Sequence, residues 1–565
     1  MLFTILFFLY FTSVIVSLII AIREVQRPIL ALTWIVFSLV IPVLAPMAYF
    51  LLSQRQVRRY LQVRRGHKIK TAVTLLHGDE TGSAEAQPSL AGPSLAKPSL
   101  AKPSVAGQSH AGFSQEKYSE AEPSPRLNAR AAQTISAWAT RMLERPPLPA
   151  EVVILKNGLA KYRMLLRTLR SAKETIDMEY YIYRNDEVGQ TVTKILIDKS
   201  MHGVRVRLLR DGLGSRKLPK RVLLAMANAG IEVRTVHPLS VWFSPMVTHR
   251  DHNKIVTIDQ HTGLIGGMNI GDEYTGKSED AGFWRDTHLQ LTGEGTKYLQ
   301  QVFDAIWDIG VPLKVKGNLN YRHKCRHKGR STSKFANKAG ARSKASLRDK
   351  FPLIEAAEEL AVPTHESLVA QASSDTQEIS PSQHTWVQTV DSGPDSDAEH
   401  VRDLFFLCAT EARHTLDIIT PYFAPDTDVV TALKTAAARG VTVRLVVPMK
   451  PDHKLIGWAC RTFYTDLLLA GINVYLYKKG ILHAKSIIVD SEACVIGAAN
   501  YDLLSFRNNY ESCEVVYSTQ FAKLLQKQFA ADIADSIELT PQEMESEPMW
   551  AKVRNKGARL LAPLL

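Results

Sequence analysis

Cysteine is scarce in this chain, with five in 565 residues, at positions 325, 408, 460, 494 and 513. No two of them form a C-x-x-C pair, and their number is odd. Disulfide-rich secreted domains and zinc ribbons are built on paired cysteines, so the sequence argues against both. Scattered thiols of this kind suit a reducing compartment.

Charged side chains are missing from two long stretches near the N-terminus, residues 1–22 and 30–52. Each is long enough to cross the hydrocarbon of a bilayer. A cleaved signal peptide would need a basic start and a small-residue cleavage site, and neither is evident. A basic cluster follows the second stretch: Arg55, Arg58, Arg59, Arg64, Arg65, Lys68 and Lys70. By the positive-inside rule, the sequence predicts a transmembrane hairpin over 1–54, with its N-terminus and all later residues in the cytoplasm.

Acidic residues are fewer than basic ones, 56 against 69, and the net charge of +13 indicates an anionic partner, either a phospholipid surface or nucleic acid. Residues 55–127 combine the basic cluster with a Pro/Ser/Ala-rich stretch that cannot bury a core, which predicts a disordered tether. Residues 313–384 read as a basic and polar insert, either disordered or bound to a membrane surface. His323 and His327 flank Cys325 there, but the surrounding cations disfavour a metal site.

The remaining chain repeats itself. The stretch that begins at Thr175 is echoed from Thr415, and the Gly-Val-x-Val-Arg-Leu of residues 203–208 is echoed at 440–445. Helical patterns alternate with short apolar strands in both copies, as in α/β layers. We therefore predict a duplicated α/β fold, with one domain over 128–312, another over 385–565, and a pseudo-two-fold pair of sheets that meet at a seam.

Each copy carries one H-x-K-x-x-x-x-D motif and a short Gly-x-x-Asn tail. The candidate site residues are His252, Lys254, Asp259 and Asn269 in the first copy and His483, Lys485, Asp490 and Asn500 in the second. On a strand, residues i and i+2 face the same way, so each histidine is expected beside its lysine. A histidine next to a fixed cation suits attack on a phosphate, with the lysine holding phosphoryl oxygens. The aspartates have the opposite parity, and we expect them to tie down the loop after the strand.

These residues resemble the signature of the phospholipase D superfamily, and the match narrows to bacterial cardiolipin synthases. The resemblance covers the N-terminal stretches and nearly everything from about residue 149 to the C-terminus. It rests on segments such as 178–189, 211–215, 266–274, 284–288, 420–423, 452–453, 505–507 and the closing 560–565. It implies a multi-pass enzyme of the bacterial inner membrane that converts two phosphatidylglycerols into cardiolipin and glycerol, without a metal or nucleotide.

The family's chemistry requires two histidines in opposite protonation states. One attacks phosphorus to form a phosphohistidine, and the other protonates the departing glycerol and later deprotonates the incoming hydroxyl. Family analogy favours His252 as the nucleophile, and the reverse assignment stays open. The resemblance further implies that both lysines, with Asn269 and Asn500, stabilise the phosphoryl oxygens. It also places Asp286 and Glu511 as the acids that orient the imidazoles.

One departure from the family concerns the second tail, where Ala498 stands in place of the usual serine. Lys485 and Asn500 remain, so activity is still expected. Three alternatives stay open: a phospholipase D or phosphatidyltransferase that uses water or another alcohol, a nuclease, and a non-catalytic lipid-binding scaffold. The predicted hairpin and the lack of an aromatic-interleaved basic motif count against the nuclease.

Overall fold

The computed structural model describes residues 10–12, 15, 127, 129–238, 249–276, 282–313, 376–377, 385–396 and 398–561. Within these ranges, no helix has the length and apolar character that a bilayer span requires. The predicted hairpin, tether and central insert lie almost wholly outside the described residues. They stay predictions, as do the domain boundaries.

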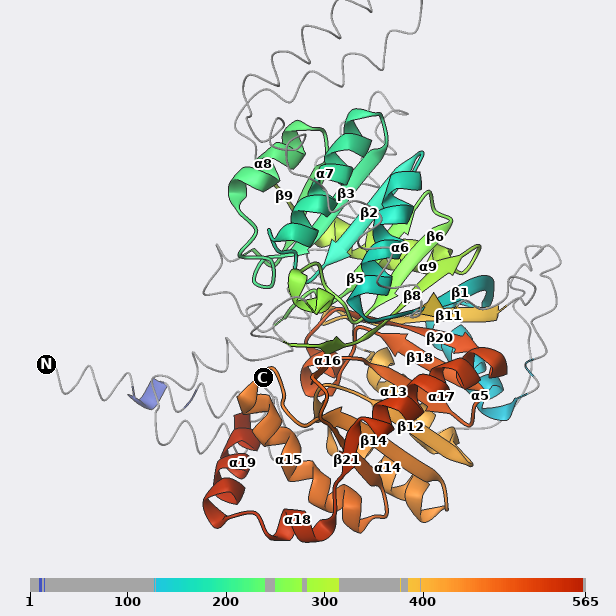
Figure 1. Cartoon of the computed structure of the whole chain (residues 1–565), viewed down its shortest axis with the longest axis vertical. Helices are drawn as coiled ribbons and strands as arrows, with labels where there is room; N and C mark the ends of the chain where they lie inside the picture. Colours follow the sequence, from blue (N-terminus) through green and yellow to red (C-terminus); the bar gives the residue numbers. More distant parts are fainter. Residues whose placement is uncertain are drawn as a thin grey trace, which may run out of the picture.

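The first half is a mixed sheet flanked by helices (Figure 1). Its elements in chain order are α5 (Arg130–Leu143), β1 (Leu148–Lys156), α6 (Asn157–Ser171), β2 (Thr175–Tyr180), α7 (Glu187–Met201), β3 (Arg205–Asp211), α8 (Lys220–Asn228), β4 (Glu232–Val236), β5 (Lys254–Ile258), β6 (Thr262–Gly266), the 3-10 turn η3 (Asp272–Thr275), β7 (Trp284–Arg285), β8 (Thr287–Thr292), α9 (Thr296–Ile309) and β9 (Val311–Pro312). The strands pair in the order β1-β8-β6-β5-β2-β3-β4-β9.

The second half repeats this plan and extends it at the C-terminal end. Its elements are β11 (Thr385–Ser392), α13 (His400–Glu411), β12 (Thr415–Ile419), β13 (Phe423–Ala424), α14 (Thr427–Ala438), β14 (Thr442–Pro448), α15 (Lys454–Leu469), β15 (Asn473–Tyr477), β16 (Ile481–Leu482), β17 (Ser486–Val489), β18 (Ala493–Gly497), β19 (Tyr501–Asp502), α16 (Leu503–Arg507), β20 (Glu511–Tyr517), α17 (Thr519–Ala534), β21 (Ser536–Glu538), α18 (Pro541–Glu545) and α19 (Met549–Leu561). The strand order, β11-β20-β18-β17-β12-β14-β15-β21, matches the first half strand for strand. The duplicated α/β fold is thus confirmed.

Local signals are repeated as well. Asp186 caps α7 by accepting from the backbone N–H of Gly189, and Asp426 caps α14 by accepting from that of Val429. A carboxylate at this position satisfies a backbone donor that would otherwise have no partner at the helix start. The two helices that follow β2 and β12 therefore begin with the same N-terminal cap, an aspartate side chain.

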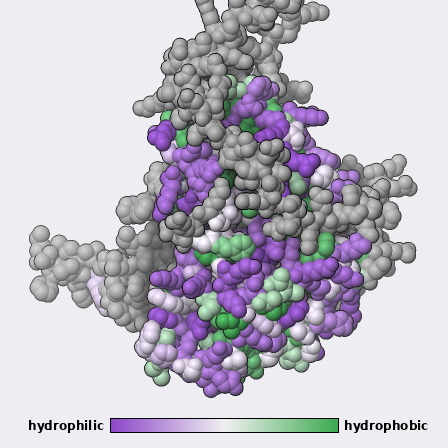
Figure 2. Space-filling view, in the orientation of Figure 1, coloured by the Kyte–Doolittle hydropathy of each residue, from purple (hydrophilic) through white to green (hydrophobic). Residues whose placement is uncertain are grey.

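The halves meet through strand β1, which belongs to both sheets. Leu148–Ala150 of β1 pair with β11, while Glu151–Lys156 pair with β8. A short β10 (Thr376–Gln377) also pairs with β1. The apolar cores continue across this seam, because Val387 and Val516 of the second half belong to the same buried cluster as Val152 of the first. On the face shown in Figure 2, the described residues are mostly hydrophilic, with scattered apolar patches.

Candidate active site

Both motifs lie at the start of a strand in the middle of its sheet. In the first, β5 begins at Lys254 and lies between β2 and β6; in the second, β17 begins at Ser486 and lies between β12 and β18. His252 and His483 precede these strands, so the expectation that each histidine sits on the strand itself is corrected. Each lysine still reaches its own histidine, because both ammonium groups contact the carbonyl oxygen of the histidine two residues earlier.

The two halves also contact each other through the backbone at each histidine. The backbone N–H of His252 donates to the carbonyl of Tyr510 at 3.0 Å, and that of His483 donates to the carbonyl of Arg285 at 2.8 Å. Strand β16, which leads into His483, pairs in parallel with β7 of the other half. Each motif is therefore held in place by the backbone of the opposite half.

The acids that orient the imidazoles are exchanged between the halves in the same way. Nδ1 of His252 lies 2.9 Å from Oε1 and 3.1 Å from Oε2 of Glu511. Nδ1 of His483 lies 2.8 Å from Oδ2 of Asp286. A carboxylate at Nδ1 fixes the tautomer and leaves the lone pair of the neutral ring on Nε2. Sequence reasoning selected both acids but not their partners, since neither acid lies on the same half as its histidine.

Each carboxylate is itself held by further hydrogen bonds. Oε1 of Glu511 accepts from the Ser505 hydroxyl at 2.8 Å and from the Asn509 amide at 3.3 Å. Oδ1 of Asp286 accepts from the backbone N–H of Thr287 at 2.7 Å. All of these groups are buried, so the orientation of both imidazoles is fixed before any substrate arrives.

Burial and neighbouring cations make His252 a neutral base. Burial, together with Lys254 and Lys485, lowers the pKa of His252 to about 4, although Glu511 opposes the shift. Burial would raise the pKa of Glu511, but His252 and Lys254 hold it below its usual range. At neutral pH the pair is thus an uncharged imidazole beside a carboxylate, the state a nucleophile requires.

Burial likewise lowers the pKa of His483, with Lys485 adding to the effect and Asp286 opposing it. This histidine has a second polar neighbour, since Nζ of Lys485 lies 2.9 Å from its Nδ1. Two aromatic rings also pack near it, Trp284 at 5.4 Å and Tyr274 at 6.2 Å between centroids. The ring of Tyr181 packs against His252 at 5.0 Å.

The two lysines are buried cations that share one electrostatic environment. Burial lowers the pKa of Lys254 to about 7 and that of Lys485 to about 8, and the carboxylates of Glu511 and Asp286 oppose both shifts. Acidic side chains of both halves therefore raise the pKa of each lysine. Two buried ammonium groups that face one site suit a substrate with a phosphodiester charge.

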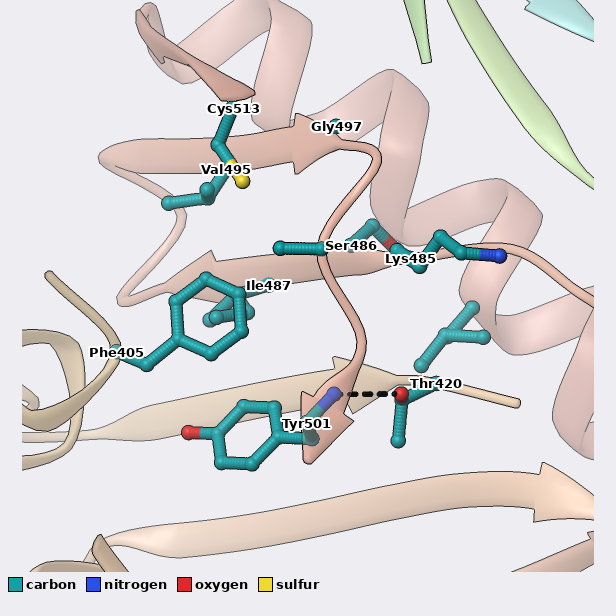
Figure 3. A pocket seen from close by; sticks show the side chains of 11 residues that line it. Phe405, Thr420, Lys485, Ser486, Ile487, Val495, Gly497, Tyr501 and Cys513 are labelled. Carbon is teal, nitrogen blue, oxygen red and sulfur yellow. Dashed lines mark hydrogen bonds between the residues drawn. The ribbon is translucent and has the colours of Figure 1, made fainter. Parts of the chain in front are cut away.

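Figure 3 shows the apolar support behind Lys485. A cavity of about 10 Å³, room for about one water molecule, is lined by Phe405, Tyr501 and Cys513 among others. The Tyr501 backbone N–H donates to the Thr420 hydroxyl at 3.1 Å, which joins the end of β12 to the tail that carries Asn500. The Lys485 side chain extends out of this cluster and carries its amine to His483.

The tail asparagines are buried but differ in their contacts. Oδ1 of Asn269 accepts from the Ile182 backbone N–H at 3.1 Å, and its Nδ2 donates to the Tyr274 hydroxyl at 2.9 Å. Oδ1 of Asn500 has no hydrogen-bond partner within the described part of the chain. The amide of Asn269 thus braces the loop, with one N–H left over, whereas the side chain of Asn500 hydrogen-bonds to Asp502.

The motif aspartates anchor loops, but not the loops we expected. Each carboxylate accepts from three consecutive backbone N–H groups: Asp259 from residues 173–175 and Asp490 from residues 413–415. These are the turns before β2 and β12, and not the loops after the aspartates' own strands. The contacts are the same in both halves, and they fix the turn that precedes a neighbouring strand.

Sequence reasoning missed a group of buried acids behind His252. Glu179 on β2 accepts from the Asn253 amide at 2.9 Å, and burial next to Asp251 raises its pKa well above the usual value. Burial raises the pKa of Asp251 to about 7 and that of Asp211 to about 6. A signal existed, because Glu179 and Asp211 lie in two of the segments, 178–189 and 211–215, that carry the family resemblance.

The fold and the paired motifs define a phospholipase D-like protein with one candidate active site built from both halves. The model for the cardiolipin synthase, PLD-like domain matches residues 165–307 and 408–533. The chain is 35% identical over 416 residues to cardiolipin synthase 2 of Bacillus cereus, covering 74% of this chain and 71% of that one. It is 32% identical over 415 residues to the major cardiolipin synthase of Bacillus subtilis, covering 73% and 75%. The chain belongs to the cardiolipin synthase family.

A solved structure shows the same fold at greater distance. Phosphatidylserine synthase of Haemophilus influenzae superposes with a TM-score of 0.53 at 14% identity, covering 77% of this chain and all of that one. At this identity the likeness supports the duplicated architecture alone. It agrees with the strand-for-strand repetition of the two sheets.

Proposed function

We propose that this protein is a cardiolipin synthase that transfers a phosphatidyl group from one phosphatidylglycerol to another and releases glycerol. The observation that carries the proposal is the exchange of carboxylates, His252 with Glu511 and His483 with Asp286, which brings both motifs into one site. Family membership adds the lipid substrate, since the relatives are named cardiolipin synthases.

In the first step, Nε2 of His252 attacks phosphorus and the bond from phosphorus to the glycerol oxygen breaks. The negative phosphodiester raises the pKa of the second histidine when it binds, because a nearby anion favours the imidazolium. His483 then donates its Nε2 proton to the departing glycerol oxygen. Lys254 and Lys485 stabilise the charge on the phosphoryl oxygens, as does the remaining N–H of Asn269.

In the second step, neutral His483 removes the proton from a glycerol hydroxyl of a second phosphatidylglycerol. That oxygen bonds to phosphorus, the bond from phosphorus to Nε2 of His252 breaks, and cardiolipin leaves. Water as the acceptor would give phosphatidic acid instead. We infer that the anionic inner membrane supplies both lipids.

The test uses purified full-length protein in vesicles of phosphatidylglycerol. Cardiolipin and glycerol should appear in equal amounts, and acid quenching should be avoided because phosphohistidine is acid-labile. Phosphatidic acid as the main product would assign the protein to phospholipase D, and the absence of both products would overturn the proposal. His252→Ala should give neither product nor phosphoenzyme.

A further inference from the structure

The exposed face of helix α19 is apolar, whereas the exposed face of a helix on a protein surface is usually polar. Met549 is 74% exposed, Trp550 66% and Val553 62%. Positions 549, 550 and 553 fall on one side of the helix, while Ala551, Asn555 and Ala558 face inward and are buried. A contiguous exposed patch of this kind marks an interaction surface.

Cations surround this patch. Arg554 lies between two indole rings, 4.5 Å from the centroid of Trp458 and 5.1 Å from that of Trp550. Lys556 is exposed on the same face of α19, and Lys454 is exposed at the start of α15. An apolar helix face with lysine and arginine at its edges complements an anionic bilayer, in which tryptophan occupies the headgroup region.

The patch continues into a groove between α15 and α19, which lie side by side at the outer edge of the second half (Figure 1). The groove has a volume of about 400 Å³ and is lined by Lys454, Trp458, Arg461 and Trp550 among others. Arg461 is paired with Glu547, and this pair has no net charge. The remaining cations, Lys454 and Arg554, therefore give the groove a positive charge. Apolar walls with a few cations suit a phospholipid headgroup and the first part of its chains.

The groove is linked to the catalytic histidine by the loop between β14 and α15. Met449 and Pro451 of this loop line the groove, and Met449 is 46% exposed. The next residue, Asp452, accepts from the Tyr422 hydroxyl at 2.7 Å and acts electrostatically on His483 and Lys485. A lipid held at this surface would therefore lie beside the loop that borders the site.

We propose that the outer face of α19 and the adjoining groove dock on an anionic phospholipid bilayer, with Trp550 and Val553 inserted and the groove holding an anionic lipid. This inference rests on the proposed function and deepens it, because it states which surface of the second half meets the substrate membrane.

The test places a fluorophore at position 553 of the full-length chain. Val553→Cys is labelled with an environment-sensitive dye in a Cys325→Ser background, since the four other cysteines are buried. His252→Ala is added so that vesicle composition stays constant. Lys434→Cys on α14, an exposed site on another helix, is the matched control.

In phosphatidylglycerol vesicles, the dye at 553 should shift to the blue, and brominated lipids should quench it at least threefold more than the control. Phosphatidylcholine vesicles should give weaker quenching. No difference from the control would overturn the docking surface, as would a blue shift without quenching, which indicates a protein contact. Equal quenching in both lipids would overturn the anionic preference.

A second measurement uses the active chain. Trp550→Ser with Val553→Ser should raise the apparent KM for vesicular phosphatidylglycerol about tenfold and leave kcat unchanged. Leu469→Ser, which removes a side chain 72% exposed at the end of α15, is the control and should change neither. Quenching of the probe, together with no cardiolipin from the chain that keeps His252, would refute the proposed function while the docking surface stands.

Discussion

The two halves share one fold but present different catalytic environments. His252 is oriented by a glutamate held by the Ser505 and Asn509 side chains, whereas the aspartate on His483 is held by a backbone N–H. The lysine of the second motif reaches Nδ1 of its histidine, while that of the first lies 5.5 Å from the Tyr181 ring. The two halves thus repeat one scaffold but differ in the side chains around each motif, and the proposed division of roles between the histidines rests on this difference.

The largest effects on rate are expected at the two histidines. These effects should depend on whether the leaving group of the substrate needs a proton. With phosphatidylglycerol, His252→Ala and His483→Ala should each lose about 10⁴-fold in rate. With a phosphatidyl p-nitrophenyl ester, whose leaving group needs no proton, His483→Ala should release a burst of nitrophenol and His252→Ala should not. The opposite pattern would reverse the assignment.

The next largest effects on rate are expected at Glu511 and Asp286, the carboxylates that contact the histidine of the opposite half. Glu511→Gln and Asp286→Asn keep the shape of each side chain but remove the charge that stabilises the imidazolium, so kcat should fall on the order of 10²-fold in each. If the halves have distinct roles, only Asp286→Asn should be rescued by the nitrophenyl ester, because its partner is the general acid. Thermal unfolding measured alongside serves as the control for folding.

Gly267 and Ala498 occupy equivalent positions in the two tails, but we expect substitutions there to change kcat by different amounts. A Cβ on Gly267 would lie 2.4 Å from Oδ1 of Asp286, so Gly267→Ala should displace that carboxylate. We expect kcat to fall about 30-fold, less than the 10²-fold or more expected when general acid catalysis is lost completely. The matching position already holds Ala498, which is buried. Ala498→Gly should leave kcat within about threefold. Equal effects at both positions would refute the packing argument.

The pH profile of kcat/KM for the phosphatidyl p-nitrophenyl ester, whose leaving group needs no proton from His483, should separate the two lysines. Both must be protonated to stabilise the phosphoryl oxygens, and His252, with a pKa of about 4, must be neutral. The rate should therefore rise above about pH 4 and begin to fall near pH 7, where Lys254 loses its proton. Lys254→Arg should move the start of this fall to about pH 8, the pKa of Lys485. Lys485→Arg should leave it near pH 7.

The smallest effect on activity is expected at the motif aspartates, where the halves are alike. Asp259→Ala and Asp490→Ala should each lower the free energy of unfolding by about 2 kcal/mol, because three backbone N–H groups lose a charged acceptor. The hydrogen bonds hold the pKa of Asp259 below its usual value although burial opposes them, so its contribution to stability is lost as pH falls through that pKa. Denaturant unfolding measures this, and kcat should stay within about twofold.

The sequence predicted the duplication and the six motif residues because they recur at fixed spacing. It also selected Asp286 and Glu511, through family resemblance. It did not predict that each acid serves the other half's histidine, because that pairing depends on how β7 and β16 meet at the seam. The turns held by Asp259 and Asp490 were missed for a similar reason, since strand order decides which turn lies beside each carboxylate.

The exchange of Glu511 and Asp286 also has an evolutionary consequence. A single-motif ancestor with this geometry would have worked as a pair of identical chains, each completing the other's imidazole. Once the copies were fused, neither could decay, because a lesion in one copy disables the histidine of the other. The two copies can therefore differ in their surrounding side chains, but each still depends on the other for the carboxylate on its histidine.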